Sequence, residues 1–305
     1  HAFGMAPTLG ATILAGGAMV LMREFKPEAA LALIEREKIT IQHAVPTMVI
    51  LELDAMERRP HNVSSLRTGI VGGAPMPPGL PERARRIMGW ELGNCLGITE
   101  CCVIALARTV DEEWVRDTTA GPLVKRMEAK VVDEAGRPVS PNQVGELCCR
   151  GPSVIPGYYK RPDLNAQQFD AEGWFRTGDM VKLDERGNLT VVGRKKEMII
   201  RGGYNIFPDE IEELIRSHPG VRDCAVIGLP DPVLGEKICA CVVLREGAEL
   251  DLARLRQHCL ARGAADFKQP DVLRVIPRVP RTGIGKVQRV ILRDGVLKDL
   301  GLCES

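Results

Sequence analysis

The segment Gly193-Arg194-Lys195-Lys196-Glu197-Met198-Ile199-Ile200-Arg201-Gly202-Gly203-Tyr204-Asn205-Ile206 decides how this chain is organised. A charged run leads into an apolar triplet, then into paired glycines and a second stretch of globular sequence. This order is typical of a hinge between two domains, because paired glycines permit a positive φ or the close approach of a ligand. An ordinary strand, a glycine turn and a solvated charge run explain the same residues, so the segment alone leaves both interpretations open.

The composition is that of an ordinary globular protein. A length of 305 residues predicts about two domains, and the 45% hydrophobic and 27% charged residues are in the usual range. Lys and Arg number 41 against 40 Asp and Glu, so the chain has no basic excess of the kind that binds nucleic acid. No apolar run approaches the roughly 18 residues that a membrane span needs. We therefore expect neither a nucleic-acid partner nor a membrane span.

Ten cysteines raise the question of disulfides or a metal centre. No two of them have the Cys-x-x-Cys spacing, and several lie in apolar runs such as residues 238–243. Reduced, buried thiols that act as small hydrophobic side chains are the favoured interpretation. We accordingly expect a cytoplasmic protein.

The first part of the chain alternates helical and strand patterns, which predicts an α/β sheet with ligands at the strand ends. The expected elements are a helix at 27–38, an extended run at 39–45, a strand at 67–71, a helix at 78–88 and a strand at 91–96. From about Glu128 the pattern changes to hairpins, which predict an antiparallel sheet or small barrel. The expected strand pairs are 129–132 with 144–149 and 180–183 with 189–192.

Beyond residue 193 the pattern predicts a small α+β domain. We expect a helix at 208–217, strands at 224–229 and 238–244, and a helix that begins after the capping residue Asp251. The predicted domains are therefore 1–193, with an α/β part at about 1–125 and a β-rich part at about 126–193, and 194–305.

Two glycine-containing segments follow predicted strands. In Gly72-Gly73-Ala74-Pro75 the glycines allow a nucleobase or phosphate to lie against the backbone, although a tight turn explains them equally well. In Gly97-Ile98-Thr99-Glu100 a hydroxyl beside a carboxylate suits phosphate contact and Mg²⁺ coordination. A surface turn is the alternative for this second segment.

Two further segments contain residues with a defined chemical capacity. Gly173-Trp174-Phe175-Arg176-Thr177-Gly178-Asp179 ends in a carboxylate that can accept hydrogen bonds from the two hydroxyls of a ribose. Pro280-Arg281-Thr282-Gly283-Ile284-Gly285-Lys286 places a lysine on a glycine-containing loop, where it could neutralise a carboxylate and a phosphate as they react. Taken alone, that lysine could equally be a solvated loop residue.

In this order the motifs resemble those of the acyl- and aryl-CoA synthetases of the adenylate-forming (AMP-dependent synthetase and ligase) superfamily. The resemblance covers essentially the whole chain. The matching segments are His1-Ala2-Phe3-Gly4, Val45-Pro46-Thr47-Met48, residues 72–75, 97–100, Gly157-Tyr158-Tyr159, and residues 173–179, 193–206 and 280–286.

The resemblance implies a two-domain enzyme that uses ATP, Mg²⁺ and CoA to convert a carboxylic acid first to acyl-AMP and then to acyl-CoA. It implies an adenylation lysine at Lys286, phosphate and Mg²⁺ contacts at Thr99 and Glu100, and a mobile C-terminal domain with its hinge at Lys196. The resemblance implies nucleotide contacts at Gly72, Gly73, Ala74, Pro75, Gly97, Ile98, Asp179 and Arg194. It implies CoA contacts at Gly202 and Gly203. His1, Phe3 and His43 are implied in the acyl pocket, together with residues 45–48, although His43 could be a hydrogen-bonded core residue.

Two departures from the family pattern accompany the resemblance. Leu96 stands where the family usually has an aromatic residue that stacks on adenine, so weaker nucleotide binding is expected. The family's loop ending in Pro-Lys-Gly, which holds the β- and γ-phosphates, is missing from this sequence, which begins at His1. We therefore expect an N-terminally truncated form of the family's architecture.

The leading hypothesis is an acid–CoA ligase for a fatty or alicyclic acid. The alternatives are an adenylation domain that loads a carrier protein and a non-catalytic module that binds nucleotide or CoA. The sequence predicts nothing about the oligomeric state.

Overall fold

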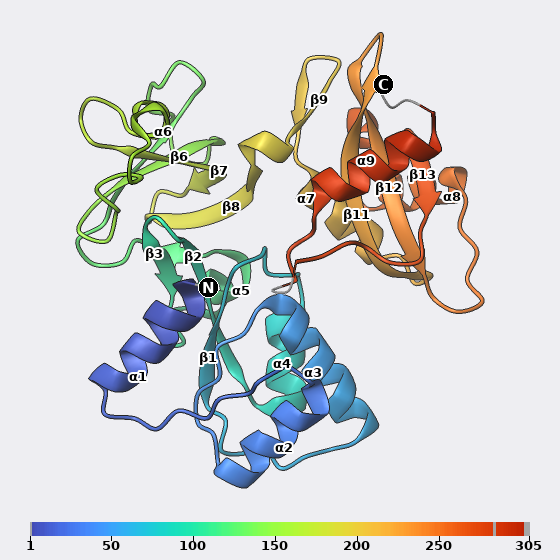
Figure 1. Ribbon diagram of the computed structural model, residues 1–305. Helices are drawn as coiled ribbons and strands as arrows, with labels where there is room; N and C mark the ends of the chain where they lie inside the picture. The colour runs from blue at the N-terminus through green and yellow to red at the C-terminus, as the bar shows by residue number, and fades with distance from the viewer. Residues whose placement is uncertain (1, 283–284, 302–305) are drawn as a thin grey trace. The chain divides into compact units, whose positions relative to one another are not determined.

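The computed structural model describes residues 2–282 and 285–301, and it divides into two compact units (Figure 1). The first unit is His1–Val191 and the second is Val192–Ser305. Each unit has its own sheets and its own buried cores.

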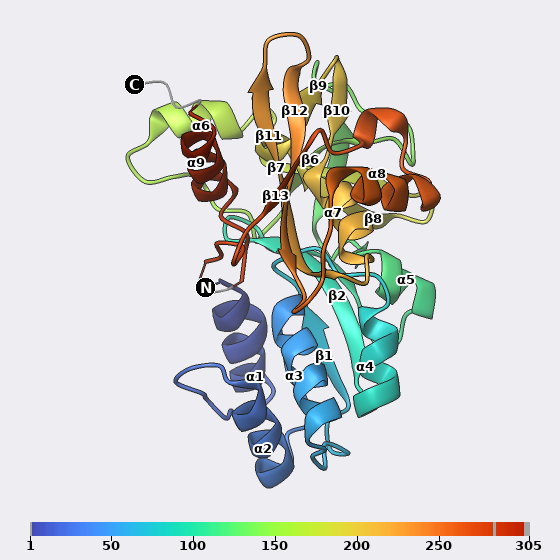
Figure 2. The same cartoon turned by 90° about the vertical axis from the view of Figure 1, so that its right-hand side faces the viewer.

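The first unit begins with a three-stranded sheet in the order β1-β2-β3. Strands β1 (Thr68–Val71) and β2 (Glu91–Ile98) are parallel, whereas β3 (Cys102–Ala107) runs antiparallel to β2. Helices α2 (Pro27–Glu37), α3 (Pro46–Arg58) and α4 (Leu80–Met88) lie side by side against the sheet (Figures 1 and 2). Their apolar side chains, with those of β1 and β2, form the first core.

The β-rich part of the first unit is a five-stranded sheet in the order β4-β8-β7-β6-β5. Its strands are β4 (Gly121–Pro122), β5 (Glu128–Val132), β6 (Gly145–Arg150), β7 (Phe175–Leu183) and β8 (Asn188–Arg194). Both predicted hairpins are present, since β5 pairs with β6 and β7 lies beside β8. The smaller helices of this unit are a π-helix at Gly4–Gly10, α1 (Ala11–Leu14), α5 (Glu113–Thr118) and α6 (Pro162–Gln168).

The second unit packs helices on both faces of one sheet. Its strands are β9 (Ile199–Arg201), β10 (Tyr204–Ile206), β11 (Val221–Asp231), β12 (Gly235–Leu244) and β13 (Val272–Val275). Its helices are α7 (Pro208–Arg216), α8 (Leu252–Ala261), α9 (Arg289–Asp299) and two 3₁₀ turns, Lys195–Glu197 and Asp266–Lys268. Alternate residues of β11 enter two different cores: Cys224 and Val226 face α7 and α8, whereas Ala225 and Ile227 face α9.

The element pattern predicted from the sequence is confirmed for most of the chain, but several elements were not predicted. They include the longer helices α3 and α9, the short helices α1, α5 and α6, and strands β3, β4 and β13. The predicted extended run at 39–45 is only partly regular, because residues 40–44 make parallel backbone hydrogen bonds to β1 without forming a full strand. Strand β3 also makes the first sheet mixed rather than purely parallel.

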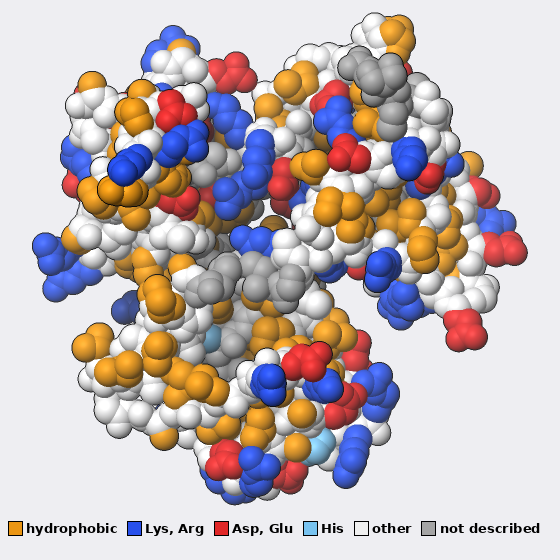
Figure 3. Space-filling model, viewed as in Figure 1, with side chains coloured by type: hydrophobic (Ala, Val, Ile, Leu, Met, Phe, Trp, Pro, Cys, Tyr) orange, Lys and Arg blue, Asp and Glu red, His pale blue; other side chains and the backbone are white. Residues whose placement is uncertain are grey.

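Charged side chains of both signs are interspersed on the face seen in Figure 3. Among the described residues, no helix combines the length and the apolar character that crossing a bilayer requires.

Helix α3 buries a carboxyl group in the first core. The Glu52 side chain is fully buried, and its Oε1 accepts a hydrogen bond of 2.6 Å from Nε2 of Gln42. Its Oε2 has no hydrogen-bond partner among the described residues. Burial raises the pKa of Glu52 from its ordinary value of 4.5 to about 7.

We predict that Glu52→Gln stabilises the protein at pH 8. The unfolded chain ionises Glu52 above pH 4.5 while the folded chain keeps its proton to about pH 7, so wild-type stability falls as pH rises through this window. The accumulated cost is about 3 kcal/mol, which the amide avoids. Urea unfolding at pH 4 and pH 8 measures the gain, which should be present at pH 8 and lost at pH 4.

Glu82→Gln is the control, because Glu82 is exposed on the neighbouring helix α4. We expect its effect to stay within about 0.5 kcal/mol. An equal gain at both pH values for Glu52→Gln would show that ionisation of Glu52 is not the cause.

Candidate functional site: the carboxyl edge of the first sheet and the lysine loop

Two of the predicted ligand-binding segments leave the same edge of the first sheet. Residues 72–75 follow the carboxyl end of β1, and residues 97–100 form the carboxyl end of the parallel strand β2 and the turn after it. Ala74 and Pro75 are exposed, as are Gly97 and Thr99. Ligands of open α/β sheets bind at this edge, so the arrangement suits a nucleotide.

The glycines at this edge are also required by the packing of the sheet. A Cβ on Gly72 would lie 2.6 Å from Sγ of Cys95, and one on Gly97 would lie 2.4 Å from the carbonyl oxygen of Cys102. Gly73 has a φ of +83°, a conformation that side chains disfavour. The side chain of Leu96 points into the core of the β-rich part and is 8% exposed, so it is not open to a nucleobase.

Glu100 is held by the motif that contains Gly157, Tyr158 and Tyr159. The Tyr158 hydroxyl donates a hydrogen bond of 2.9 Å to Oε1 of Glu100, and the backbone N–H of Ile155 donates to the Glu100 carbonyl oxygen. The pKa of Tyr158 is raised to about 12, mainly by burial and to a smaller extent by this hydrogen bond. Two segments more than 50 residues apart in sequence thus fix one carboxylate.

Asp179 and Glu100 both act electrostatically on the Cys101 thiol. The Cys101 thiol follows Glu100 directly and contacts the Cys149 thiol, and its pKa is raised by that contact and by burial, with smaller contributions from the Glu100 and Asp179 carboxylates. Both carboxylates therefore lie within electrostatic range of one buried sulfur atom.

A bulge in β7 sets the direction of Asp179. Glu146 of β6 pairs with Met180 and Cys148 pairs with Arg176, so residues 177–179 stand opposite the single residue Leu147. Gly178 has a φ of +70° with open space around it, so the backbone and not the packing requires glycine there. The Thr177 hydroxyl bonds the Leu147 carbonyl and accepts from the Asp179 N–H, which fixes the bulge.

His43 and Phe3 meet beside Gly72. Their rings are in edge contact with centroids 6.1 Å apart, and a Cβ on Gly72 would be 3.6 Å from the Phe3 ring. The backbone N–H of Ile70 donates to Nδ1 of His43 at 3.1 Å, which places the ring proton on Nε2. Burial lowers the pKa of His43, so the ring is neutral at pH 7. His1, the third residue predicted for the acyl pocket, lies outside the described residues.

The segment that decides the chain's organisation forms a 3₁₀ turn and a tight hairpin. Arg194 ends β8, and the exposed Lys196 lies in the turn at Lys195–Glu197. Gly202 and Gly203 connect β9 to β10 with φ values of +58° and +82°, as a two-residue hairpin turn requires. Gly202 and Gly203 therefore form the ordinary glycine turn that was one of the two interpretations of this segment.

A partly buried arginine, with 15% of its side chain exposed, joins the end of that turn to the rest of the second unit. Arg289, the first residue of α9, donates hydrogen bonds of 2.7 Å to Glu197, Asp209 and Glu212, and its Nε donates to the Val226 carbonyl. Burial alone would lower the pKa of Arg289, but the three carboxylates raise it, so the guanidinium remains charged. Lys286 lies on the loop three residues before Arg289.

The residues at the carboxyl edge fit a magnesium ion that binds together with a nucleotide. Within residues 2–282 and 285–301 no three His, Cys, Asp or Glu side chains gather into a metal-binding group. Mg²⁺ commonly takes one or two protein carboxylates and completes its shell with phosphate oxygens and water. Glu100 can supply such a carboxylate.

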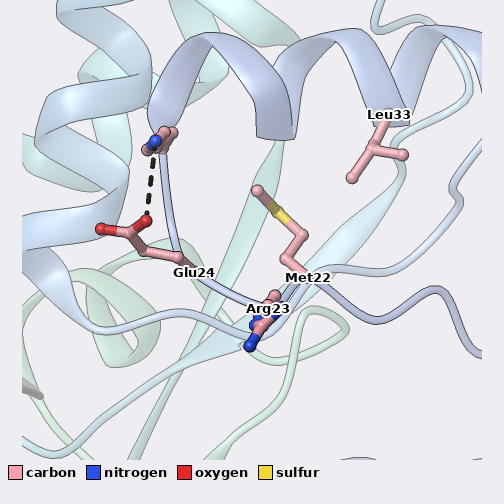
Figure 4. Close-up of a pocket in the computed structure, with 5 residues that line it drawn as sticks. Met22, Arg23, Glu24 and Leu33 are labelled. Carbon is pink, nitrogen blue, oxygen red and sulfur yellow. Dashed lines mark ion pairs between the residues drawn. The ribbon is translucent and has the colours of Figure 1, made fainter.

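A separate depression lies near the start of α2 and is lined by Met22, Arg23, Glu24, Lys26 and Leu33 (Figure 4). Glu24 and Lys26 form an ion pair of 3.6 Å across it, and both side chains are largely exposed. It contains none of the predicted site residues.

Comparisons with known proteins identify the family. The model of the AMP-binding enzyme family matches residues 1–159, and that of the AMP-binding enzyme C-terminal domain matches residues 210–286. The chain belongs to the AMP-binding enzyme family. Its fold matches that of ATP-bound MatB from Rhodopseudomonas palustris, with a TM-score of 0.91, 31% identity and coverage of 98% of this chain and 59% of the other.

Curated relatives of this AMP-binding enzyme are adenylate-forming ligases. Pyochelin synthase PchD of Pseudomonas aeruginosa is 41% identical over 96% of this chain, and a salicylyl-CoA synthase / salicylate adenylyltransferase of a Streptomyces species is 38% identical over 97%. A 2-hydroxy-7-methoxy-5-methyl-1-naphthoate–CoA ligase of Streptomyces carzinostaticus is 38% identical over 96%. The chain spans about half the length of these relatives, 53% to 54%.

Sequence reasoning missed the residues that support this enzyme's candidate site. Tyr158 was noted only as part of a motif, and neither Arg289 nor Arg281 was singled out. The side chains that they bond lie 58 to 92 residues away along the chain, beyond the reach of any local pattern. The one local signal for Arg289 is its position directly before the apolar residues 290–292 at the start of α9.

We predict that Arg289→Met destabilises the second unit by about 3 to 5 kcal/mol, because Glu212 is left buried without its principal cation. The double variant Arg289→Met/Glu212→Gln should be more stable than Arg289→Met alone. Urea unfolding followed by far-UV circular dichroism measures both.

Arg293→Met is the matched control on the same helix. Arg293 pairs with Glu236 at 3.5 Å and is 43% exposed, so its loss should cost less than about 1 kcal/mol. Equal losses for the Arg289 and Arg293 variants would contradict the role given to burial.

Proposed function

We propose that this protein activates an aromatic carboxylic acid with ATP and transfers the acyl group to a thiol. In the first step a carboxylate oxygen attacks the α-phosphorus of ATP, and pyrophosphate leaves. In the second step a thiol sulfur attacks the acyl carbon, loses its proton, and AMP leaves. The geometry that supports this most directly is the Tyr158–Glu100 hydrogen bond, at the edge of the sheet where residues 72–75 emerge.

Each candidate residue has a chemical task in this proposal. Asp179 accepts hydrogen bonds from the ribose hydroxyls, and the backbone of residues 72–75 lies along the adenine. Thr99 and Glu100 hold the phosphates and Mg²⁺, which supplies positive charge against the phosphate oxygens. Further nucleotide contacts come from Gly97, Ile98 and Arg194, whereas Gly202 and Gly203 border the path of the thiol's pantetheine arm.

Lys286 serves the first step. Its ammonium group neutralises the negative charge that develops between the carboxylate and the α-phosphate. The predicted boundary at 193/194 separates a nucleotide-binding domain from a mobile domain that turns at Lys196 between the two steps. These assignments rest on the resemblance and on the family membership of the chain.

The acid is proposed to carry a hydroxyl group ortho to its carboxyl group. The names of two relatives specify such acids, salicylate and 2-hydroxy-7-methoxy-5-methyl-1-naphthoate. The fixed Nε2–H of His43, beside the Phe3 ring, is a donor suited to an oxygen on an aromatic acid. The fatty or alicyclic acid expected from the sequence has no such specific support.

CoA is the proposed thiol, since both of those relatives are named for CoA thioesters. A holo-carrier protein is the second candidate, and comparison of the two acceptors with preformed acyl-AMP decides between them. The buried, unbridged thiols are compatible with a cytoplasmic location, which remains part of the proposal.

We predict that Lys286→Ala, made in the intact protein, abolishes acid-dependent ATP–pyrophosphate exchange and largely spares thioester formation from supplied acyl-AMP. The lysine charge is needed only while the phosphate reacts. The two half-reactions are measured separately.

Equal loss of both half-reactions would remove the role assigned to Lys286. The wild-type protein could also bind AMP or CoA while none of the acids tested supports pyrophosphate exchange. In that case the non-catalytic binding module becomes the correct description.

A panel of acids tests the substrate class. We expect salicylate to support pyrophosphate exchange at least about tenfold better than benzoate or octanoate, since a site that bonds a substrate hydroxyl discriminates against acids without it. In His43→Leu the ratio of salicylate to benzoate should fall while the rate with benzoate is retained. A higher rate with octanoate than with salicylate would contradict the aromatic assignment.

A further inference from the structure

The loop that presents Lys286 is closed at its base by backbone hydrogen bonds. The Thr282 N–H donates to the Lys286 carbonyl at 2.8 Å, and the Gln288 N–H donates to the Pro280 carbonyl at 2.9 Å. Arg281 and Val287 form an antiparallel bridge between these bonds. The Thr282 hydroxyl also accepts from the Lys286 N–H at 3.1 Å, so both backbone polar groups of Lys286 are held by Thr282.

The Arg281 side chain ties this loop to the sheet of the second unit. Its Nη1 donates a hydrogen bond of 2.8 Å to the Gly285 carbonyl, directly before Lys286. Its Nη2 donates, also at 2.8 Å, to Oδ1 of Asp223 on β11. The planar guanidinium is suited to this task because it holds two acceptors in one fixed fork.

Strand β11 is a rigid support for this contact. It pairs with β12 along most of its length, and its alternate residues are buried in two cores. The Asp223 Oδ1 additionally accepts from the backbone N–H of Cys224. A displacement of the loop would therefore break the Arg281 fork rather than move the strand.

We propose that Arg281 is a positioning residue that fixes the place from which Lys286 reaches the reacting phosphate. This inference rests on the adenylation role of Lys286 given above. A lysine side chain has a long flexible stem, so a mobile backbone would leave its ammonium group poorly placed. Anchoring the carbonyl of the preceding residue removes that freedom before the substrate arrives. The positive charge of Arg281 is paired with the Asp223 carboxylate.

The experiment compares six variants of the intact protein: Arg281→Ala, Arg281→Lys, Asp223→Ala, Arg281→Ala/Asp223→Ala, Arg278→Ala and Lys286→Ala. Arg278 is the matched control, because it lies three residues before Arg281, is exposed, and makes no hydrogen bond or ion pair within the described part of the chain. Acid-dependent ATP–pyrophosphate exchange and thioester formation from supplied acyl-AMP are measured for each, together with the melting temperature.

We expect Arg281→Ala to lose about 10- to 100-fold in pyrophosphate exchange, the order that misplacement of a catalytic group produces. Thioester formation and the melting temperature should stay near those of Arg278→Ala. Arg281→Lys should remain impaired in exchange, since one ammonium cannot span Gly285 and Asp223 as the fork does. Asp223→Ala should repeat the defect, and the double variant Arg281→Ala/Asp223→Ala should be no worse than Arg281→Ala.

Three outcomes would overturn the inference: unchanged exchange in Arg281→Ala, parallel losses in both half-reactions, or additive losses in the double variant. Parallel losses with a lowered melting temperature would show a purely structural role. A failure of the proposed function is distinguished by Lys286→Ala: if that variant exchanges pyrophosphate like the wild type, the lysine assignment fails. If Lys286→Ala is inactive and Arg281→Ala is not, only the positioning role fails.

Discussion

The partly buried guanidinium of Arg289 makes the interaction on which the second unit depends. It gathers the end of the turn at Lys195–Glu197, two carboxylates of α7 and a carbonyl of β11 around the first residue of α9. Taking these charges out of water is costly, and only the full set of partners offsets that cost. Glu197 is therefore fixed to this unit, whereas its neighbours Lys195 and Lys196 are exposed. The loop bearing Lys286 leads directly into the same arginine.

Arg281 and Arg289 flank that loop, and the guanidinium group of each bonds carboxylate and carbonyl oxygens in a different structural role. Arg289 is surrounded by carboxylates and joins secondary-structure elements that are remote in sequence. Arg281 shares its fork between one carboxylate and one carbonyl, and it joins Gly285 to β11. The first interaction joins α7, β11 and α9, and the second joins the backbone next to Lys286 to β11.

Local patterns predicted the parts of the fold that local physics determines. Alternating residues predicted the hairpins of the β-rich part, Asp251 predicted the start of α8 through its bond to the Arg254 N–H, and Pro27 predicted the start of α2. Helix α9 was missed because Gly295 and several charged residues interrupt its apolar pattern. The candidate site was predicted as residue types in order, but the hydrogen bonds from Tyr158 to Glu100 and from Arg281 to Asp223 join segments that are 58 residues apart. The glycines illustrate the limit, because Gly72 and Gly97 are needed for strand packing whether or not a ligand binds.

The buried cysteines allow the opening of each core to be followed by thiol labelling. Eight of the nine described thiols are buried, and burial raises the pKa of Cys95 and Cys224 to about 12, so almost no thiolate is present at neutral pH. Alkylating reagents can therefore modify these residues only while the surrounding core is open. Cys101 and Cys149 share one core of the first unit, and Cys224 and Cys259 share one core of the second. The rate at which each pair is labelled reports how often its own core opens, without any added probe.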